Sequence, residues 1–258
     1  MPTKFDKGHV QLWTCALDGV PPFLRSRLSD LLTPDEQERA RRFRFSIHRD
    51  RYIACRAALR TLLGTYLGIV PRDVQLVHNA HGKPALNHSG AALTFNLAHC
   101  EGFALLAFGY EQELGVDVEN VTRTMDYEGV AGAAFSAEER ATLLSLYGAD
   151  RAAWFFRCWT LREAYLKGVG TGFAARPSAL CMHDADDRSA LMLRSENDES
   201  EHWELRAIDL PAPYVGAIAT RAALKSCKVS AFQWDQAQRY LPVLAEKREP
   251  RPSRADIL

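Results

Sequence analysis

The order of the helical and strand-like patterns is the feature that most constrains the fold of this chain. The segment Thr33-Pro34-Asp35-Glu36 combines an N-cap, a first-turn proline and a capping box, and it predicts a helix to about residue 45. A second helix is predicted over 49–67, and short strands follow it rather than alternate with it. The same order recurs after a second capping box, which begins at Ser136. Helices followed by strands predict an α+β fold rather than alternating β-α-β units.

This pattern divides the chain at about residues 110–113, although the two parts show no close internal repeat. We expect an N-terminal α+β half over 1–112, a C-terminal α+β half over 113–224 and a partly loose extension over 225–258, with a loose tail from 245. A further long helix is predicted over 152–167. The predicted strands cover 9–17, 74–78, 93–97, 103–109, 114–120, 179–182, 191–194, 203–208 and 214–220.

Composition excludes several classes of protein. The 258 residues carry a formal net charge of +0, so the overall field favours no nucleic acid or membrane partner. No apolar run is long enough to cross a bilayer or to act as a signal core, which predicts a cytoplasmic protein. The six cysteines contain no Cys-x-x-Cys pair, so we expect neither a zinc site nor a disulfide framework.

Two carboxylates mark the strand at 115–119, which reads Gly-Val-Asp-Val-Glu. Side chains alternate along a strand, so Asp117 and Glu119 share one face while Val116 and Val118 face a core. One interpretation is a solvated acidic face on a half-exposed strand. The other is a divalent metal ion, which would relieve the repulsion between the two carboxylates.

A helical segment at 159–167 adds a carboxylate and a cation. Glu163 and Lys167 lie four residues apart and therefore share a helix face. Taken alone, they are explained by a surface ion pair. Together with the acidic strand, they suggest a metal site beside a lysine that can hold phosphate.

Arginines and a lysine supply further candidates for phosphate binding. Between residues 39 and 60 there are eight arginines, of which Arg49, Arg56 and Arg60 share a helix face. A solvated helix face with salt bridges explains most of the eight equally well. Residues 81–86 form a turn with Lys83 at its tip, and the strand 93–97 leads to His99, which has either a structural or a ligand role.

With these segments assembled, the chain resembles the 4′-phosphopantetheinyl transferase superfamily, and within it the larger monomeric type that serves nonribosomal peptide and polyketide synthases. The family signatures, a G-[IV]-D-x-E strand and a W-x-x-[KR]-E-[AS]-x-x-K helix, match residues 115–119 and 159–167 in the family's order. The resemblance extends from about residue 31 to 220 and includes the segments GKPAL and FNLAH.

The resemblance implies two pseudo-twofold-related α+β halves with the active site between them. It implies an enzyme, a holo-[acyl-carrier-protein] synthase, that is monomeric and magnesium-dependent. Its substrates would be coenzyme A and an apo acyl or peptidyl carrier protein. The 4′-phosphopantetheine arm would pass to a carrier serine, and 3′,5′-ADP would leave.

The same resemblance assigns roles to individual residues. Mg²⁺ would be held by Asp117, Glu119 and Glu163. The catalytic residues would be Glu163, Lys167 and Asp117, with Glu163 as the candidate general base. Coenzyme A would be contacted by Arg39, Arg56, Gly82, Lys83, Pro84, Asn96, His99, Asp117, Glu163 and Lys167. We expect Glu163 to be only weakly basic, because a metal ion and a lysine nearby would favour its ionised form.

Some positions depart from the family pattern. Ala98 and Cys100 stand where relatives commonly have serine. Ala98 has no hydroxyl to donate to a phosphate, so that contact is lost or comes from the backbone. Arg39 stands where some relatives have lysine, which keeps the charge, whereas Glu36 stands where some have another lysine. The resemblance therefore does not imply a second cation near the 3′-phosphate.

Three functions other than phosphopantetheine transfer would each explain part of the sequence. A nucleic-acid- or nucleotide-binding module would use the arginines but would leave the acidic set unexplained. A noncatalytic relative that binds coenzyme A and acts as an adaptor would be expected to have lost Lys167 or a carboxylate, and neither is lost. A different magnesium-dependent phosphoryl enzyme is a fourth option. For a carrier protein, we expect a landing surface over 121–134, with Met125, Tyr127 and Val130 as its apolar residues.

Overall fold

The computed structural model describes residues 7–18, 20–87, 92–170, 181–184, 190–194, 203–221 and 223–234 of the chain. Its α-helices are α1 (Pro22–Asp30), α2 (Pro34–Arg41), α3 (Ser46–Leu67), α4 (Tyr127–Ala134), α5 (Ala137–Ser145) and α6 (Gly148–Val169). Its strands are β1 (His9–Ala16), β2 (Leu76–His78), β3 (Pro84–Leu86), β4 (Leu93–Cys100), β5 (Phe103–Tyr110), β6 (Leu114–Asn120), β7 (Cys181–Asp184), β8 (Ala190–Arg194), β9 (Glu204–Ile208), β10 (Tyr214–Thr220) and β11 (Ser226–Phe232).

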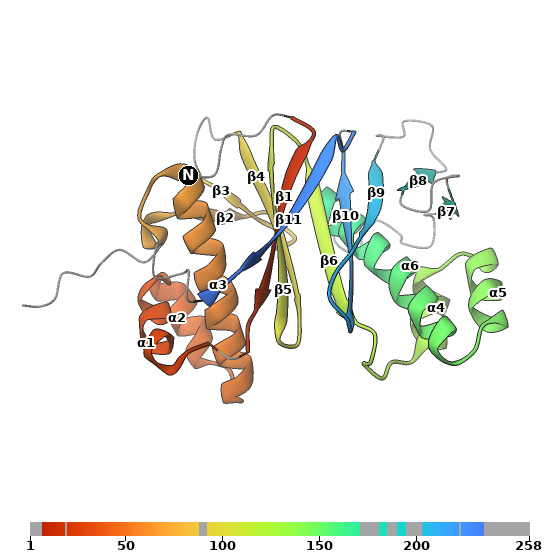
Figure 1. The fold of residues 1–258 in the computed structure, drawn as a ribbon, viewed down its shortest axis with the longest axis horizontal. Coiled ribbons are helices and arrows are strands. Elements are labelled where there is room, and N and C mark those ends of the chain that lie inside the picture. Colours follow the sequence, from red (N-terminus) through yellow and green to blue (C-terminus); the bar gives the residue numbers. More distant parts are fainter. Residues whose placement is uncertain are drawn as a thin grey trace, which may run out of the picture.

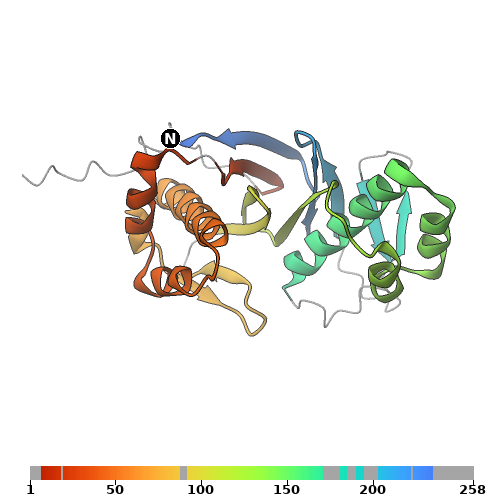
Figure 2. The ribbon, with the colours of Figure 1, turned by 90° about the horizontal axis from the view of Figure 1, so that it is seen from below.

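Two sheets form the centre of the molecule, and helices cover its two ends. The first sheet has the order β11-β1-β5-β4 and the second has the order β6-β10-β9-β8-β7. Figure 1 shows α1–α3 beyond the first sheet and α4–α6 beyond the second, which gives four layers. Strands β2 and β3 form a separate hairpin, whose tip reaches toward the end of α6 in Figure 2.

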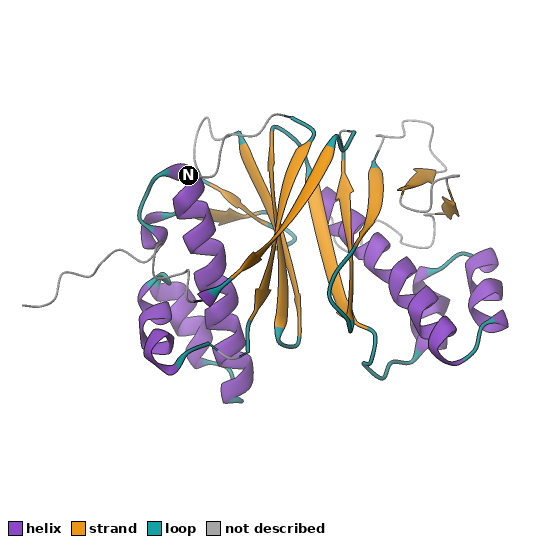
Figure 3. Ribbon diagram, viewed as in Figure 1, coloured by secondary structure: helices purple, strands orange, loops and turns teal. Residues whose placement is uncertain are grey.

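The apolar composition of β5 follows from its place between these layers. Leu106 and Phe108 belong to the cluster packed under α1 and α3, whereas Leu105 and Ala107 belong to the cluster between the two sheets. Because both faces of β5 are covered, its sequence is a nearly continuous apolar run instead of an alternating one. The separation of helical and strand layers is evident in Figure 3 and confirms the predicted α+β fold.

Strand β6 alternates because its two faces meet different layers. Val116 and Val118 are buried in the cluster between the sheets. Asp117 and Glu119 therefore point the other way, toward α6. Gly115 permits this close packing, because a Cβ atom there would lie 2.1 Å from the carbonyl oxygen of Ala164 in α6. Both face assignments agree with the sequence-based expectation.

The two halves share one plan. Helices α2 and α5 both begin with a capping box, formed by Thr33 with Glu36 and by Ser136 with Glu139. The next long helix, α3 or α6, has 22 residues and ends at a glycine in the left-handed conformation. In the sheets, β1, β5 and β4 are paired in the same order as β6, β10 and β9.

A buried ion pair repeats in the same way. The capping-box Glu36 pairs with Arg60 of α3 at 2.5 Å, and the capping-box Glu139 pairs with Arg162 of α6. Arg60 is 2% exposed and Arg162 is 0% exposed, so both side chains are buried inside the protein. This repeat of side-chain roles supports the expected relationship between the halves, which no close sequence repeat had indicated.

Several local expectations were incomplete. The helix predicted to about residue 45 ends at Arg41, and residues 84–86 form β3 rather than only a turn. Helices α1 and α4 were not predicted, nor was β11, which lies within the expected extension 225–258 and pairs parallel with β1. The predicted strand residues 179–180 and the tail 245–258 lie outside the described residues. No described helix combines the length and apolarity required to span a bilayer.

Candidate active site

A cavity of about 900 Å³ lies between the helices of the first half and the end of α6. Six of the predicted coenzyme-contacting residues line it: Arg39, Arg56, Gly82, Pro84, His99 and Lys167. Lys167 comes from α6, and the others come from the N-terminal half. The cavity is therefore a space shared between the halves, as expected.

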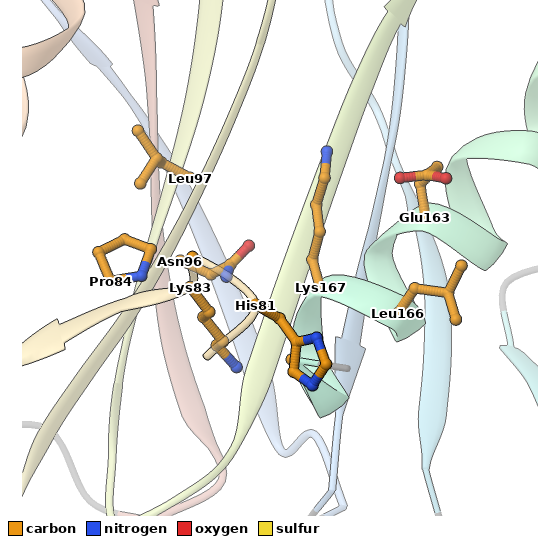
Figure 4. A pocket seen from close by; sticks show the side chains of 10 residues that line it. His81, Lys83, Pro84, Asn96, Leu97, Glu163, Leu166 and Lys167 are labelled. Carbon is orange, nitrogen blue, oxygen red and sulfur yellow. The ribbon is translucent and has the colours of Figure 1, made fainter. Parts of the chain in front are cut away.

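A second cavity of about 240 Å³ adjoins the first and shares Gly82, Pro84, Leu97 and Lys167 with it. Its lining adds the predicted residues Lys83, Asn96 and Glu163. Figure 4 shows the hairpin residues on one side of this space and Glu163, Leu166 and Lys167 of α6 on the other. Of the predicted coenzyme-contacting set, only Asp117 lines neither of these two cavities, because it is buried beneath Lys167.

The ammonium group of Lys167 binds the deepest carboxylate of the site. Its Nζ atom donates to Oδ1 of Asp117 at 2.5 Å. Asp117 is 4% exposed, whereas the Lys167 side chain is 35% exposed and reaches the cavity. Strand β6 and helix α6 thus hold an anion and a cation together at the cavity wall.

The three expected metal ligands lie near one another but do not form a ready-made cluster. Among the described residues, no three His, Cys, Asp or Glu side chains are grouped closely enough to hold a metal ion. Glu119 explains the difference, because its Oε1 accepts from the indole of Trp159 at 3.3 Å and its Oε2 accepts from Arg123 at 3.4 Å. Both oxygens of the Glu119 carboxylate are therefore bound by side chains of the protein.

The other two carboxylates retain the chemistry expected of metal ligands. Within the described part of the chain, Oδ2 of Asp117 and Oε1 of Glu163 are buried without a hydrogen-bond partner. The pKa of Asp117 is raised to about 7, mainly by burial and to a smaller extent by Glu119 and Glu163, against the opposing effect of Lys167. Burial also raises the pKa of Glu163, and the Glu119 carboxylate adds to this effect. Two unsatisfied carboxylate oxygens with raised pKa values are suited to a divalent cation.

The carboxylate of Glu36 forms ion pairs with two arginines of α3. It pairs with Arg56 at 2.7 Å and with Arg60, which also donates to the carbonyl oxygens of Pro71, Arg72 and Val74. Arg60 is therefore structural, whereas Arg56 lines the large cavity. Arg49 is exposed beside Asp50, so the three arginines that share a helix face have three different roles.

Three other predicted residues differ in their surroundings. Asn96 accepts a hydrogen bond from the backbone N–H of Val116 at 3.0 Å and so links β4 to β6. The Lys83 ammonium donates to the carbonyl oxygens of Gly168, at the end of α6, and Leu114, at the start of β6, and Lys83 does not line the large cavity. Burial, followed by the nearby Lys167, lowers the pKa of His99, which favours its neutral form.

Sequence reasoning missed several lining residues of the large cavity. Arg51 lines it and forms two hydrogen bonds of 2.7 Å with Asp18, and Tyr52 lines it beneath the guanidinium of Arg39. Arg51 was one of the eight arginines counted, but nothing in its spacing distinguished it. Ala98, one of the positions that depart from the expected family pattern, also lines this cavity.

The three apolar residues of the expected carrier surface contact the interior of the second half. Met125, Tyr127 and Val130 are partly buried and pack on a cluster of buried aromatic residues. The Tyr127 ring lies 4.9 Å from that of Phe155 and 6.0 Å from that of Phe156, measured between centroids. Much of their apolar surface is thus used within the protein.

Comparisons with known proteins agree with the two-part plan. A family model described as "4'-phosphopantetheinyl transferase superfamily" matches residues 113–219, and one described as "4'-phosphopantetheinyl transferase, N-terminal" matches residues 25–110. The chain is 41% identical over 171 residues to the 4'-phosphopantetheinyl transferase HetI of a Nostoc species, which covers 64% of this chain and 70% of that protein.

Two further relatives are more distant. A phosphopantetheinyl transferase of a Thraustochytrium species is 28% identical over 222 residues, covering 78% of this chain and 75% of that protein. The 4'-phosphopantetheinyl transferase Sfp of Bacillus subtilis is 24% identical over 148 residues, covering 57% and 64%. From these matches, the chain belongs to the 4′-phosphopantetheinyl transferase superfamily, whose enzymes transfer phosphopantetheine to carrier proteins.

Proposed function

We propose that this enzyme transfers the 4′-phosphopantetheine arm of coenzyme A to a serine of an acyl or peptidyl carrier protein, with Mg²⁺ as cofactor and 3′,5′-ADP as the leaving product. The observation that carries this proposal is the large cavity, where Arg39, Arg56 and His99 of one half face Lys167 of the other. Coenzyme A is a polyanion, and a guanidinium group can bind two oxygens of one phosphate at the same time.

Coenzyme A would lie across both halves. Arg39 and Arg56 would bind its phosphates, and Gly82 and Pro84 would shape the wall beside adenine and ribose. His99 would donate to a phosphate, and binding an anion would raise its depressed pKa. Asn96 would support this wall by joining β4 to β6, and Lys83 would contribute its stem to the smaller cavity.

The carboxylates fit a magnesium ion by their unsatisfied oxygens. Asp117 and Glu163 would hold it, with Glu119 as a third ligand once its contact with Arg123 is released. When bound, Mg²⁺ would neutralise charge on the phosphate oxygens of the substrate. Coordination requires the ionised carboxylates, so it would reverse the raised pKa values of Asp117 and Glu163.

In the transfer, the serine oxygen forms a bond to the β-phosphorus of coenzyme A, and the bond from that phosphorus to the 5′-phosphate oxygen of 3′,5′-ADP breaks. Glu163 would accept the serine proton, directly or through water. Burial raises the pKa of Glu163 in the metal-free site, whereas bound Mg²⁺ and the nearby Lys167 would favour its ionised form. Lys167 would stabilise the negative charge on the departing ADP.

The reaction is tested by intact-protein mass spectrometry of an apo carrier protein incubated with the enzyme, coenzyme A and Mg²⁺. We expect a mass gain of one phosphopantetheine group that requires Mg²⁺ and is lost with Glu163→Gln. Asp150→Asn is the matched control, because it makes the same acid-to-amide change on the exposed first turn of α6. Transfer that persists after removal of all divalent metal would overturn the cofactor assignment, and full activity of Glu163→Gln would overturn the role of that residue.

The remaining proposals concern the setting of the reaction. We expect a monomer, because one chain supplies both sides of the large cavity. The carrier partners would belong to nonribosomal peptide or polyketide synthases, and the enzyme would act in the cytoplasm. The division into 1–112, 113–224 and 225–258 is part of the same proposal. Light scattering of the purified enzyme and a panel of carrier proteins check the oligomeric state and the partner class.

A further inference from the structure

The tip of the β2–β3 hairpin belongs to the N-terminal half but contacts the C-terminal half. The Asn79 side chain donates to the carbonyl oxygen of Gly170, the C-cap of α6, at 2.9 Å. The Lys83 ammonium donates to the carbonyl oxygen of Gly168 at 2.5 Å and to that of Leu114, at the start of β6, at 3.5 Å. Two side chains of one turn therefore bind the end of α6 and its neighbouring strand.

The end of a helix is a suitable place for such contacts. The last carbonyl groups of a helix have no partners within it, and lysine side chains near this end interact favourably with the helix dipole. The fit is close, because a Cβ atom on Gly170 would lie 2.9 Å from Cδ of Lys83 and 3.2 Å from Nδ2 of Asn79. The positive φ of Gly170, +77°, further restricts this position to glycine.

The turn that presents the two side chains is itself braced. Oδ1 of Asn79 accepts from the backbone N–H groups of His81 and Lys83, both at 2.9 Å. The Asn79 N–H donates to the Lys83 carbonyl at 3.0 Å, and Gly82 takes a φ of +85° between them. Asn79 thus fixes the turn with its amide oxygen and holds α6 with its amide nitrogen.

The helix end held in this way carries the reacting groups. Lys167 immediately precedes Gly168, and Glu163 lies one turn earlier on α6. Figure 4 shows Lys83 and Lys167 pointing in opposite directions, so the Lys83 ammonium is directed away from that of Lys167. Any shift of this helix end would change the distance between Lys167 and the arginines of the N-terminal half.

We propose that Asn79 and Lys83 are positioning residues that clasp the C-terminal end of α6 to the N-terminal half and so set Glu163 and Lys167 against the coenzyme. This inference rests on the proposed function, and it gives Lys83 a role distinct from direct phosphate binding. The clasp acts through the helix backbone, and its two members act together.

The test compares Lys83→Met and Asn79→Ala with Val77→Thr, an exposed position on the same hairpin. Hydrogen exchange of the peptide spanning 164–170 is measured together with kcat, KM for coenzyme A and the affinity for 3′,5′-ADP. Both clasp variants should speed exchange at the end of α6 and lower kcat by roughly tenfold or more, because small displacements of catalytic groups are costly. The affinity for 3′,5′-ADP should change by less than about twofold.

Different results would overturn the clasp. If Lys83→Met weakens 3′,5′-ADP binding by about tenfold or more while Asn79→Ala does not, Lys83 is a phosphate ligand. Unchanged exchange over 164–170 in both variants would also exclude it. Lys83→Arg, which can still donate to both carbonyl groups, should restore slow exchange and guards against a Met variant that does not fold. If the unaltered enzyme transfers nothing, the proposed function fails, whereas the exchange experiment still decides the clasp.

Discussion

The two halves share one fold, but equivalent positions of their long helices, α3 and α6, carry different residues. In α3, Thr61 and Thr65 follow the buried Arg60, and the Thr65 hydroxyl donates to the carbonyl oxygen of Thr61 at 2.8 Å. At the same spacing in α6, Glu163 and Lys167 follow the buried Arg162. The equivalent positions therefore carry two threonines in one half and an ionisable pair in the other. In the proposed function, the binding cations come mainly from the first half and the reacting groups from the second.

Packing distances differ between the halves as well. Strand β6 lies directly on α6, because Gly115 has no Cβ to meet the backbone of Ala164. Strand β1 is joined to α3 through long side chains, with the Trp13 indole donating to Tyr66 at 2.9 Å and Tyr66 donating to Gln11 at 2.6 Å. A short carboxylate can reach a helix lysine only where the elements lie close. The close approach at Gly115 therefore lets Asp117 of β6 reach Lys167 of α6 in the second half.

The largest expected effect concerns the repeated ion pair. Arg60→Met and Arg162→Met should each lower the free energy of unfolding by about 3–5 kcal/mol, because each leaves a buried glutamate without its main partner. Arg60→Met should be the more severe, since three backbone carbonyl groups also lose a donor. Urea denaturation measures both. If either variant lowers the free energy of unfolding by less than about 1 kcal/mol, the two ion pairs do not stabilise their halves in the same way.

A smaller effect should follow from closing the gap between β6 and α6. Gly115→Ala places a methyl group 2.1 Å from a backbone oxygen, so it should cost about 1–3 kcal/mol of stability. It should also lower kcat, because Asp117 moves with the strand. Gly132→Ala in α4 meets no atom within 4 Å and is the control, with stability expected to be unchanged or slightly raised. Equal behaviour of the two variants would contradict the importance of close packing.

The division between binding and chemistry predicts a change in KM alone. Arg56→Leu should raise KM for coenzyme A by about tenfold, the equivalent of one charge-assisted hydrogen bond, and leave kcat nearly unchanged. Arg41→Leu removes an exposed arginine that pairs with Glu38 and should change neither constant. Steady-state kinetics with saturating carrier protein provides the measurement. A fall in kcat for Arg56→Leu at unchanged KM would assign this residue to the chemical step.

The smallest effect is expected at the rim of the acidic site. Arg123→Gln should change stability by less than about 0.5 kcal/mol, because its contact with Glu119 is long and half-exposed. It should release Glu119 and so lower, by about twofold, the Mg²⁺ concentration that gives half-maximal transfer. Titration of activity with Mg²⁺ checks this. A higher requirement for Mg²⁺ would show that Arg123 supports the metal site instead of competing with it.

Much of the fold was accessible from local sequence. Capping boxes begin α2 and α5 as predicted, and β6 spans the predicted residues 114–120 because its alternation is strict. Strand β11 was not recognisable, since its polar residues gain their place only by pairing with β1, far away in the chain. Helix α4 was missed because glycine and alanine dominate it and provide little apolar periodicity.

The site shows the same limit. Spacing alone placed Asp117 and Glu119 on one face of β6 and Glu163 and Lys167 on one face of a helix, and these faces do meet. Sequence did not indicate that Trp159 and Arg123 would hold Glu119, or that the Lys83 ammonium would bind the end of α6. Such partners depend on the distance between elements, which residue patterns do not encode.

Strand β11 has a consequence for biosynthesis. It lies alongside β1 in the first sheet, with Ser226 opposite His9, although β11 is translated long after β1. Until β11 emerges, one edge of β1 exposes unpaired backbone groups, which invite pairing with other chains. A product terminated before residue 226 would keep that open edge permanently. The edge of β1 is therefore covered only after residues 226–232 have been translated.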